Sequence, residues 1–191
     1  AAYVALDWVS HVDPLGPLGV TPWNPSPGLA LFLLLRCGLR HAPWLFAAAF
    51  LAQLLVGGMP APWPVMAATS AIIALGYTGI AAVLTRKLHF GRDLATLRDV
   101  TAFIATTVVG TLAIALLCVI LFAAAGVLPL ELFARSAAQL WIGDLIGVVV
   151  TTPVLLVATR PLPAARTVSP VEAVAQIAEG REEAGHERDD E

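Results

Sequence analysis

Apolar runs bounded by proline, glycine and charged residues recur along the chain, and they constrain its fold more than any other feature. They cover about residues 1–12, 27–40, 43–58, 63–85, 98–126 and 136–159. The last three are as long as the roughly 20 residues that cross a bilayer, or longer. With 58% hydrophobic and 13% charged residues among 191, a soluble domain could not bury this much apolar surface. We predict an all-α, polytopic transmembrane helix bundle with about five to six crossings, some of them short or broken by proline.

The basic residues indicate an orientation for these helices. Ten of the eleven Lys and Arg residues fall on one side of the predicted topology, and only Arg135 falls on the other. Because Lys and Arg accumulate in cytoplasmic loops, both chain ends are expected to face the cytoplasm, given one crossing in the N-terminal fragment. The proline-rich segments at 21–28 and 57–64 then face outward, as does the turn at 126–135.

The polarity of the chain changes after residue 160 and divides it into two parts. Residues 1–160 form the expected integral membrane domain, and its apolar start without an initiator Met suggests a cropped N-terminus. Residues 161–191 are expected to be a cytoplasmic polar tail or the start of a signalling helix, and both alternatives stay open. Ser169, Pro170 and Glu172 would make a good helix start in this part.

An aspartate lies inside the last apolar run, QLWIGDLIGVVVTTPVLLV (139–157). On insertion scales, Asp at the centre of a membrane helix costs roughly 2.5–3.5 kcal/mol, so Asp144 needs partners that offset this penalty. Trp141 lies on the same helical stripe, which is expected to face the interior of the bundle. Gly143 and Gly147 form a GxxxG pattern, which lets another helix approach closely.

Few polar side chains are predicted at the outward level where Asp144 lies. They are Asn24, Gln53, Ser70 and Gln139. A carboxylate at this depth can be neutralised by protonation, by a hydrogen-bond network, by a cation or by a ligand. Two interpretations of Asp144 therefore stay open. It ties its helix to the entry of the 27–40 helix, or it senses a ligand, a proton or an ion directly.

The entry to the 27–40 helix is rich in proline. Pro25 and Pro27 are expected to prevent regular helix before Gly28 and to leave backbone groups that need partners. Broken helix entrances often mark binding sites in membrane proteins. The alternative is a tight extracellular turn in which Trp23 anchors at the interface. The candidate ligand- or signal-sensing residues are Asp144, Trp141, Gly143, Gly147, Trp23, Asn24, Pro25, Gly28 and Gln53.

The sequence contains no motif of a soluble enzyme, neither a P-loop nor an HExxH or GxSxG pattern. Its two cysteines and four histidines lack the spacing of a metal site, so we expect neither a metal nor another cofactor. Nucleic-acid binding is not expected, because the net charge is −3 and the basic residues follow the membrane topology.

Three motifs carry a resemblance to a known family. They are WNPSPGLALFLLL (23–35), LTRKL (84–88) with LRDVTAFIATTVVGTLAIALL (97–117), and QLWIGDLIGVVVTTPVLLV (139–157). In this order they resemble the MASE1 membrane-associated sensor domain, whose last motif is W-x-G-D-x-x-G followed by proline. The residues that match this last motif are Trp141, Gly143, Asp144, Gly147 and Pro153. The residues that match the earlier motifs are Trp23, Pro25, Gly28, Arg98 and Asp99.

The resemblance implies a non-catalytic, integral membrane sensory domain of a bacterial signalling protein, located in the cytoplasmic (inner) membrane. Such a domain passes an extracytoplasmic or membrane signal to a cytoplasmic output domain in the same chain, which is a histidine kinase, diguanylate cyclase or phosphodiesterase. MASE1 domains usually continue with further membrane helices after the W-x-G-D helix, whereas this chain continues into the polar part.

The expected partners are the lipid bilayer, the output domain, a second copy of the chain, and an unidentified small ligand or partner membrane protein. A second copy is expected because kinase and cyclase outputs often need dimers. The alternative function comes from a different class: a small solute-binding subunit of a membrane transporter. An intramembrane aspartate beside a broken helix would also suit the capture of a solute.

Overall fold

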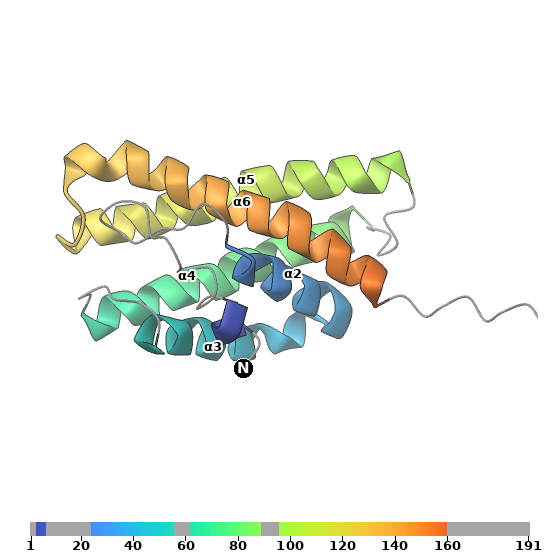
Figure 1. The fold of residues 1–191 in the computed structure, drawn as a ribbon, viewed down its shortest axis with the longest axis horizontal. Coiled ribbons are helices and arrows are strands. Elements are labelled where there is room, and N and C mark those ends of the chain that lie inside the picture. The colour runs from blue at the N-terminus through green and yellow to red at the C-terminus, as the bar shows by residue number, and fades with distance from the viewer. Residues whose placement is uncertain (1–2, 7–23, 56–61, 89–95, 160–191) are drawn as a thin grey trace, which may run out of the picture. The chain divides into compact units, whose positions relative to one another are not determined.

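The computed structural model describes residues 3–6, 24–55, 62–88 and 96–159, and every regular element within them is helical (Figure 1). Residues 3–6 form one helical turn. The other elements are α2 (Ser26–Cys37), η1 (Leu39–His41), α3 (Ala42–Leu55), α4 (Trp63–Ala82), η2 (Val83–Lys87), α5 (Leu97–Ala124), η3 (Leu130–Leu132) and α6 (Phe133–Ala158). Here η1 and η3 are 3₁₀ turns, whereas η2 is a π-helical turn that continues α4. The predicted all-α class is confirmed.

Three of the described helical segments are long and apolar enough to cross a membrane: Trp63–Lys87, Leu97–Ala124 and Leu130–Ala158. The helices α2 and α3 have only 12 and 14 residues. At 1.5 Å per residue they extend about 18 and 21 Å, against a hydrocarbon core of about 30 Å. As predicted, both are shorter than the roughly 20 residues of a full crossing. The polytopic part of the predicted fold class is also confirmed.

Local capping explains where α5 begins. The Thr96 hydroxyl accepts a hydrogen bond from the Asp99 backbone N–H at 3.1 Å and donates one to Asp99 Oδ2 at 2.7 Å. This reciprocal cap satisfies an N–H group that has no acceptor inside the helix. The helix therefore starts at Leu97, one residue before the predicted position.

The start of α2 differs from the expectation drawn from the sequence. We expected Pro25 and Pro27 to prevent regular helix before Gly28, but α2 begins at Ser26 and holds Pro27 in its first turn. The expectation was wrong because N–H groups in the first turn have no intrahelical acceptor, so a proline there removes no hydrogen bond. The same reason lets α4 accept Pro64 in its first turn.

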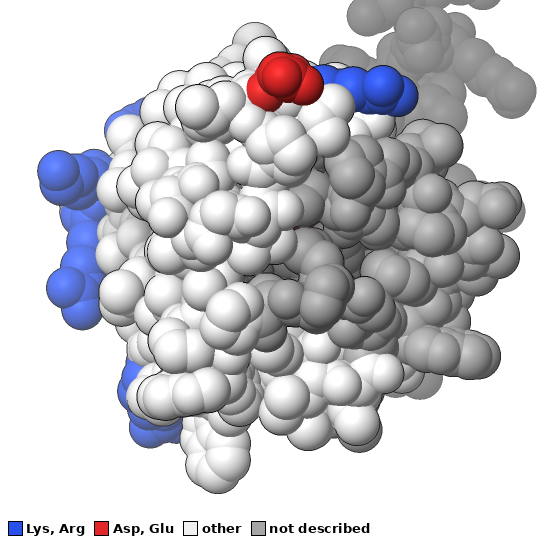
Figure 2. Space-filling view, turned by 90° about the vertical axis from the view of Figure 1, so that its left-hand side faces the viewer, with Lys and Arg blue, Asp and Glu red and all other residues white. Residues whose placement is uncertain are grey.

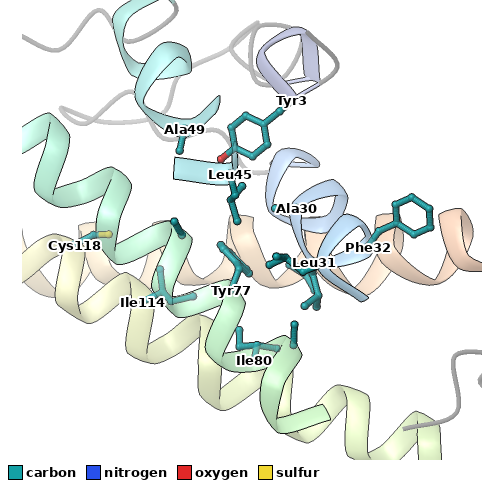
Figure 3. Close-up of a cluster of buried hydrophobic side chains, with 14 of the residues drawn as sticks. Tyr3, Ala30, Leu31, Phe32, Leu45, Ala49, Tyr77, Ile80, Ile114 and Cys118 are labelled. Carbon is teal, nitrogen blue, oxygen red and sulfur yellow. The ribbon is translucent and has the colours of Figure 1, made fainter. Parts of the chain in front are cut away.

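Five pairs of helices pack against each other: α2 with α6, α6 with α5, α5 with α4, α4 with α3, and α2 with α4. Two glycines allow the close contact between α4 and α5. A Cβ on Gly76 would overlap the side chain of Ile114, and one on Gly110 would overlap that of Ile80. Tyr77, fully buried, points into the apolar cluster beside these contacts (Figure 3).

Large apolar side chains also cover the outside of the described helices. Leu55, Leu75 and Val109 are 67%, 71% and 68% exposed. Figure 2 shows charged side chains at the edges of the viewed face, whereas most of the described surface between them, drawn in white, is uncharged. Apolar patches of this extent mark a surface that another apolar phase covers, and around long apolar helices this phase is the lipid bilayer.

Candidate functional site

Asp144 forms a junction between three segments of the chain. It lies on α6 and is 5% exposed. Its Oδ1 accepts a hydrogen bond from Asn24 Nδ2 at 3.2 Å, and its Oδ2 accepts one from the Tyr77 hydroxyl at 2.9 Å. The carboxylate thus joins α6 to α4 and to the entry of α2. Two donors aimed at the carboxylate oxygens offset part of the penalty for burying this charge.

The backbone around Asn24 fixes the direction of its amide. Asn24 Oδ1 accepts a hydrogen bond from the Ser26 N–H at 3.3 Å, which is the geometry of an Asx turn. The Asn24 N–H donates to the Gly143 carbonyl at 3.4 Å. Because Oδ1 is engaged by the first turn of α2, the NH₂ group of the amide is directed at Asp144. The predicted partnership between Asn24 and Asp144 is present in the structure.

Two glycines let the entry of α2 lie directly on the backbone of α6. A Cβ on Gly147 would overlap the Asn24 carbonyl group, and one on Gly28 would lie 2.6 Å from Thr151 Cβ. The Thr152 hydroxyl, fully buried, then donates to the Gly28 carbonyl at 2.9 Å. The GxxxG pattern was expected to admit another helix, and here it admits the first turn of α2 and the two residues before it.

Tyr77 is the member of the junction that the sequence analysis missed. Its side chain is fully buried in the second half of α4. A signal for it was available, because tyrosines of membrane proteins concentrate at the water interface. A tyrosine far from both ends of a predicted spanning helix needs a partner for its hydroxyl.

Gln53 and Ser70, two of the side chains considered as partners of Asp144, bind each other instead. Gln53 Nε2 donates to Ser70 Oγ at 2.7 Å and to the Met66 carbonyl at 3.3 Å. These hydrogen bonds join α3 to α4. Gln53 is therefore part of a second polar contact, separate from the junction at Asp144.

The other predicted site residues lie at different places. Trp141 is half-buried, and its Nε1 donates to the Val108 carbonyl of α5 at 3.2 Å, so it links α6 to α5 rather than to Asp144. Pro25 is buried at the N-cap position of α2. Trp23 lies outside the described residues.

The chemistry of the junction is that of a hydrogen-bonded carboxylate beside a phenol and an amide. Within the described residues, no three His, Cys, Asp or Glu side chains lie close enough together to hold a metal ion. Asp144 is also the only acidic side chain of α6. The arrangement binds helices to each other, and its strength depends on how both donors are oriented.

Taken together, the long apolar helices and the buried polar junction define a multi-pass helical membrane domain. The MASE1 family model matches residues 15–170, and the chain belongs to the MASE1 family. This family comprises membrane-associated sensory domains of signalling proteins, and the domain itself is non-catalytic. The family predicted from the three motifs is confirmed. No curated protein and no solved structure matches the chain.

Proposed function

We propose that this MASE1 domain passes an extracytoplasmic or membrane signal to a cytoplasmic output domain, and that the Asp144 junction is the element through which it does so. The output domain would be a histidine kinase, a diguanylate cyclase or a phosphodiesterase in the same protein. This proposal takes residues 1–160 as the sensory membrane domain in the bacterial inner membrane and residues 161–191 as the connection to the output. Both chain ends then face the cytoplasm, and the output works in a homodimer.

One observation carries the proposal: a single buried carboxylate accepts hydrogen bonds from two segments that are otherwise distinct. Asn24 at the entry of α2 and Tyr77 on α4 both donate to Asp144 on α6. α6 is also the last described helix before the segment that begins at residue 160. A stimulus that displaces the entry of α2 therefore changes how α6 is held against α4.

The energies involved suit a switch. Interhelical hydrogen bonds in membranes contribute about 0.6 kcal/mol on average and up to about 1.7 kcal/mol. Two such bonds hold one arrangement by about 1–3 kcal/mol, which is a factor of roughly 5–150 in a two-state equilibrium. A ligand or partner shifts that equilibrium only by its differential affinity for the two arrangements. Breaking the junction therefore needs only a weakly discriminating stimulus.

The test measures output and folding in the same samples. The domain joined to its native output domain is compared with Asp144→Asn and Tyr77→Phe in membranes, and the output activity and thermal stability of each are recorded. Ser70→Ala is the matched control, because it removes a hydrogen bond between α3 and α4 outside the junction. We expect the two junction variants to lock or abolish the output while staying folded, and the control to signal normally.

Two outcomes of this experiment contradict the expectation. If the output of the junction variants changes only in proportion to the loss of folded protein, Asp144 is an architectural residue. If Ser70→Ala alters the output as strongly as Tyr77→Phe, signal transmission is not specific to the junction. Either result would refute the proposal that the signal passes through Asp144.

A further inference from the structure

Basic side chains from four elements gather at one end of the described helices. They are Arg36 at the end of α2, Arg40 in η1, Arg86 and Lys87 in η2, and Arg98 in the first turn of α5. All five are exposed. The elements are connected through α4 and η2: η1 contacts α4, η2 continues α4, and η2 contacts α5. We call these five residues the basic end.

The described part of the protein does not neutralise this charge. Asp99 is the one acidic residue described at this end, so the described net charge there is 5 − 1 = +4. Asp99 belongs to the N-terminal cap of α5, where it accepts from the Thr96 hydroxyl. None of the five basic side chains makes an ion pair with a described carboxylate, so the described residues leave this end with a net positive charge.

The opposite end of the molecule is different. Glu131 lies in η3, and Arg135 follows in the first turn of α6. Figure 2 looks at the end where α5 finishes and α6 begins, and an acidic (red) and a basic (blue) group are both visible near the top of this view. Among the described residues, this end therefore carries one charge of each sign and no net charge.

Apolar and aromatic side chains beside the basic end indicate its depth in the membrane. Trp44, one turn after Arg40, is 74% exposed, and Leu97, next to Arg98, is 80% exposed. An exposed indole beside cationic groups is typical of the level of the lipid headgroups, where the ring is in contact with the acyl chains and the charge with the phosphates.

We propose that the basic end is a binding site for an anionic phospholipid, with the headgroup phosphate held between η1 and η2. Arginine is suited to this role because its planar guanidinium binds phosphate through two parallel hydrogen bonds, while lysine adds a point charge. Each basic residue near an anionic membrane surface contributes about a fivefold preference for it. The proposal does not depend on the signalling role of Asp144.

Native mass spectrometry of the full chain tests this site. The protein is exchanged into an equimolar mixture of phosphatidylglycerol and phosphatidylcholine, and the lipid that stays bound is identified. The test variant replaces Arg40, Arg86 and Lys87 by glutamine, and Arg135→Gln at the opposite end is the matched control. We expect at least tenfold preferential retention of phosphatidylglycerol, its loss in the triple variant, and no change in the control.

Three results would overturn the proposal. The first is equal retention of both lipids, and the second is undiminished retention in a folded triple variant. If the triple variant does not fold, Arg86→Gln alone is measured and must reduce retention severalfold. The third concerns the acidic residues of the 181–191 segment, which carry the opposite charge. If phosphatidylglycerol binds only after these acids are changed to amides, that segment occupies the basic end and the lipid does not.

Discussion

Replacing Gly147 by alanine tests the contact that brings the entry of α2 onto α6. A Cβ at this position would overlap the carbonyl carbon and oxygen of Asn24 and lie 3.3 Å from the Pro25 nitrogen. All of these are backbone atoms, so no side-chain rotation can relieve the overlap. In Gly147→Ala the entry of α2 must therefore move away from α6.

Two destabilising effects and one stabilising effect set the expected change in stability. Inserting a methyl group into a packed interior costs about 1–3 kcal/mol. Displacing Asn24 also weakens its hydrogen bond to Asp144, which is 3.2 Å long and contributes up to about 1.7 kcal/mol in a membrane. Alanine gains about 0.8–1.0 kcal/mol over glycine in helix propensity. The net destabilisation is about 2 kcal/mol, and at most about 4 kcal/mol.

Gly79→Ala provides a matched control for this measurement. Gly79 lies on α4, and a Cβ there would meet no other atom within 4 Å. The same methyl group in the same membrane should therefore leave stability unchanged or raise it slightly. Unfolding is followed by circular dichroism in mixed micelles with increasing dodecyl sulfate. If Gly147→Ala unfolds at the same dodecyl sulfate fraction as Gly79→Ala, the close contact between Asn24 and α6 is refuted.

Three further substitutions test other polar groups of the bundle. Thr107→Val should stabilise the domain by about 1 kcal/mol, because the Thr107 hydroxyl is buried with no hydrogen-bond partner among the described residues. Thr152→Val loses the 2.9 Å hydrogen bond to the Gly28 carbonyl and should destabilise the domain in the same unfolding assay. Gln53→Leu removes both hydrogen bonds from α3 to α4 and should cost about 1 kcal/mol without altering signal output in the membrane assay. Trp141→Phe removes the indole bond to α5 but keeps most of the ring, so a loss above about 2 kcal/mol in the unfolding assay would contradict the role assigned to that bond.

The sequence predicted the helices well because their physical cause is local. Runs of apolar residues bounded by proline, glycine and charge specify where a helix can cross a bilayer. The capping residues shifted the ends slightly. Thr96 moved the start of α5 to Leu97, and α6 begins at Phe133 because η3 leads directly into it. The predicted start of α2 was wrong because the missing N–H of Pro27 was counted as a lost intrahelical hydrogen bond, although the first turn makes none there.

The partners of Asp144 were harder to predict because pairing depends on rotation about each helix axis. The alternation of basic loops gives the depth of a residue but not the direction in which it faces. Gln53 and Ser70 were considered at the correct level, yet they face each other across α3 and α4. Asn24 was predictable because the chain at the entry of α2 has little freedom beside Gly28 and Gly147.

Exchanging the side chains of Asn24 and Asp144 tests whether the hydrogen-bond pattern or the position of the carboxylate determines the role of Asp144. In Asp144→Asn, an amide oxygen can still accept from the Tyr77 hydroxyl, but the new NH₂ group faces the NH₂ group of Asn24. Rotating the Asn24 amide only moves this conflict to the Ser26 N–H, which then loses its acceptor.

Adding Asn24→Asp removes the conflict, because a carboxylate at position 24 accepts from the Ser26 N–H and from the new amide together. It also lies at the N-terminus of α2, where the helix dipole favours negative charge. We therefore expect the double variant to recover stability and output that Asp144→Asn alone has lost. A double variant no better than Asp144→Asn would show that the carboxylate is needed on α6 itself, and the hydrogen-bond geometry would then not account for the role of Asp144.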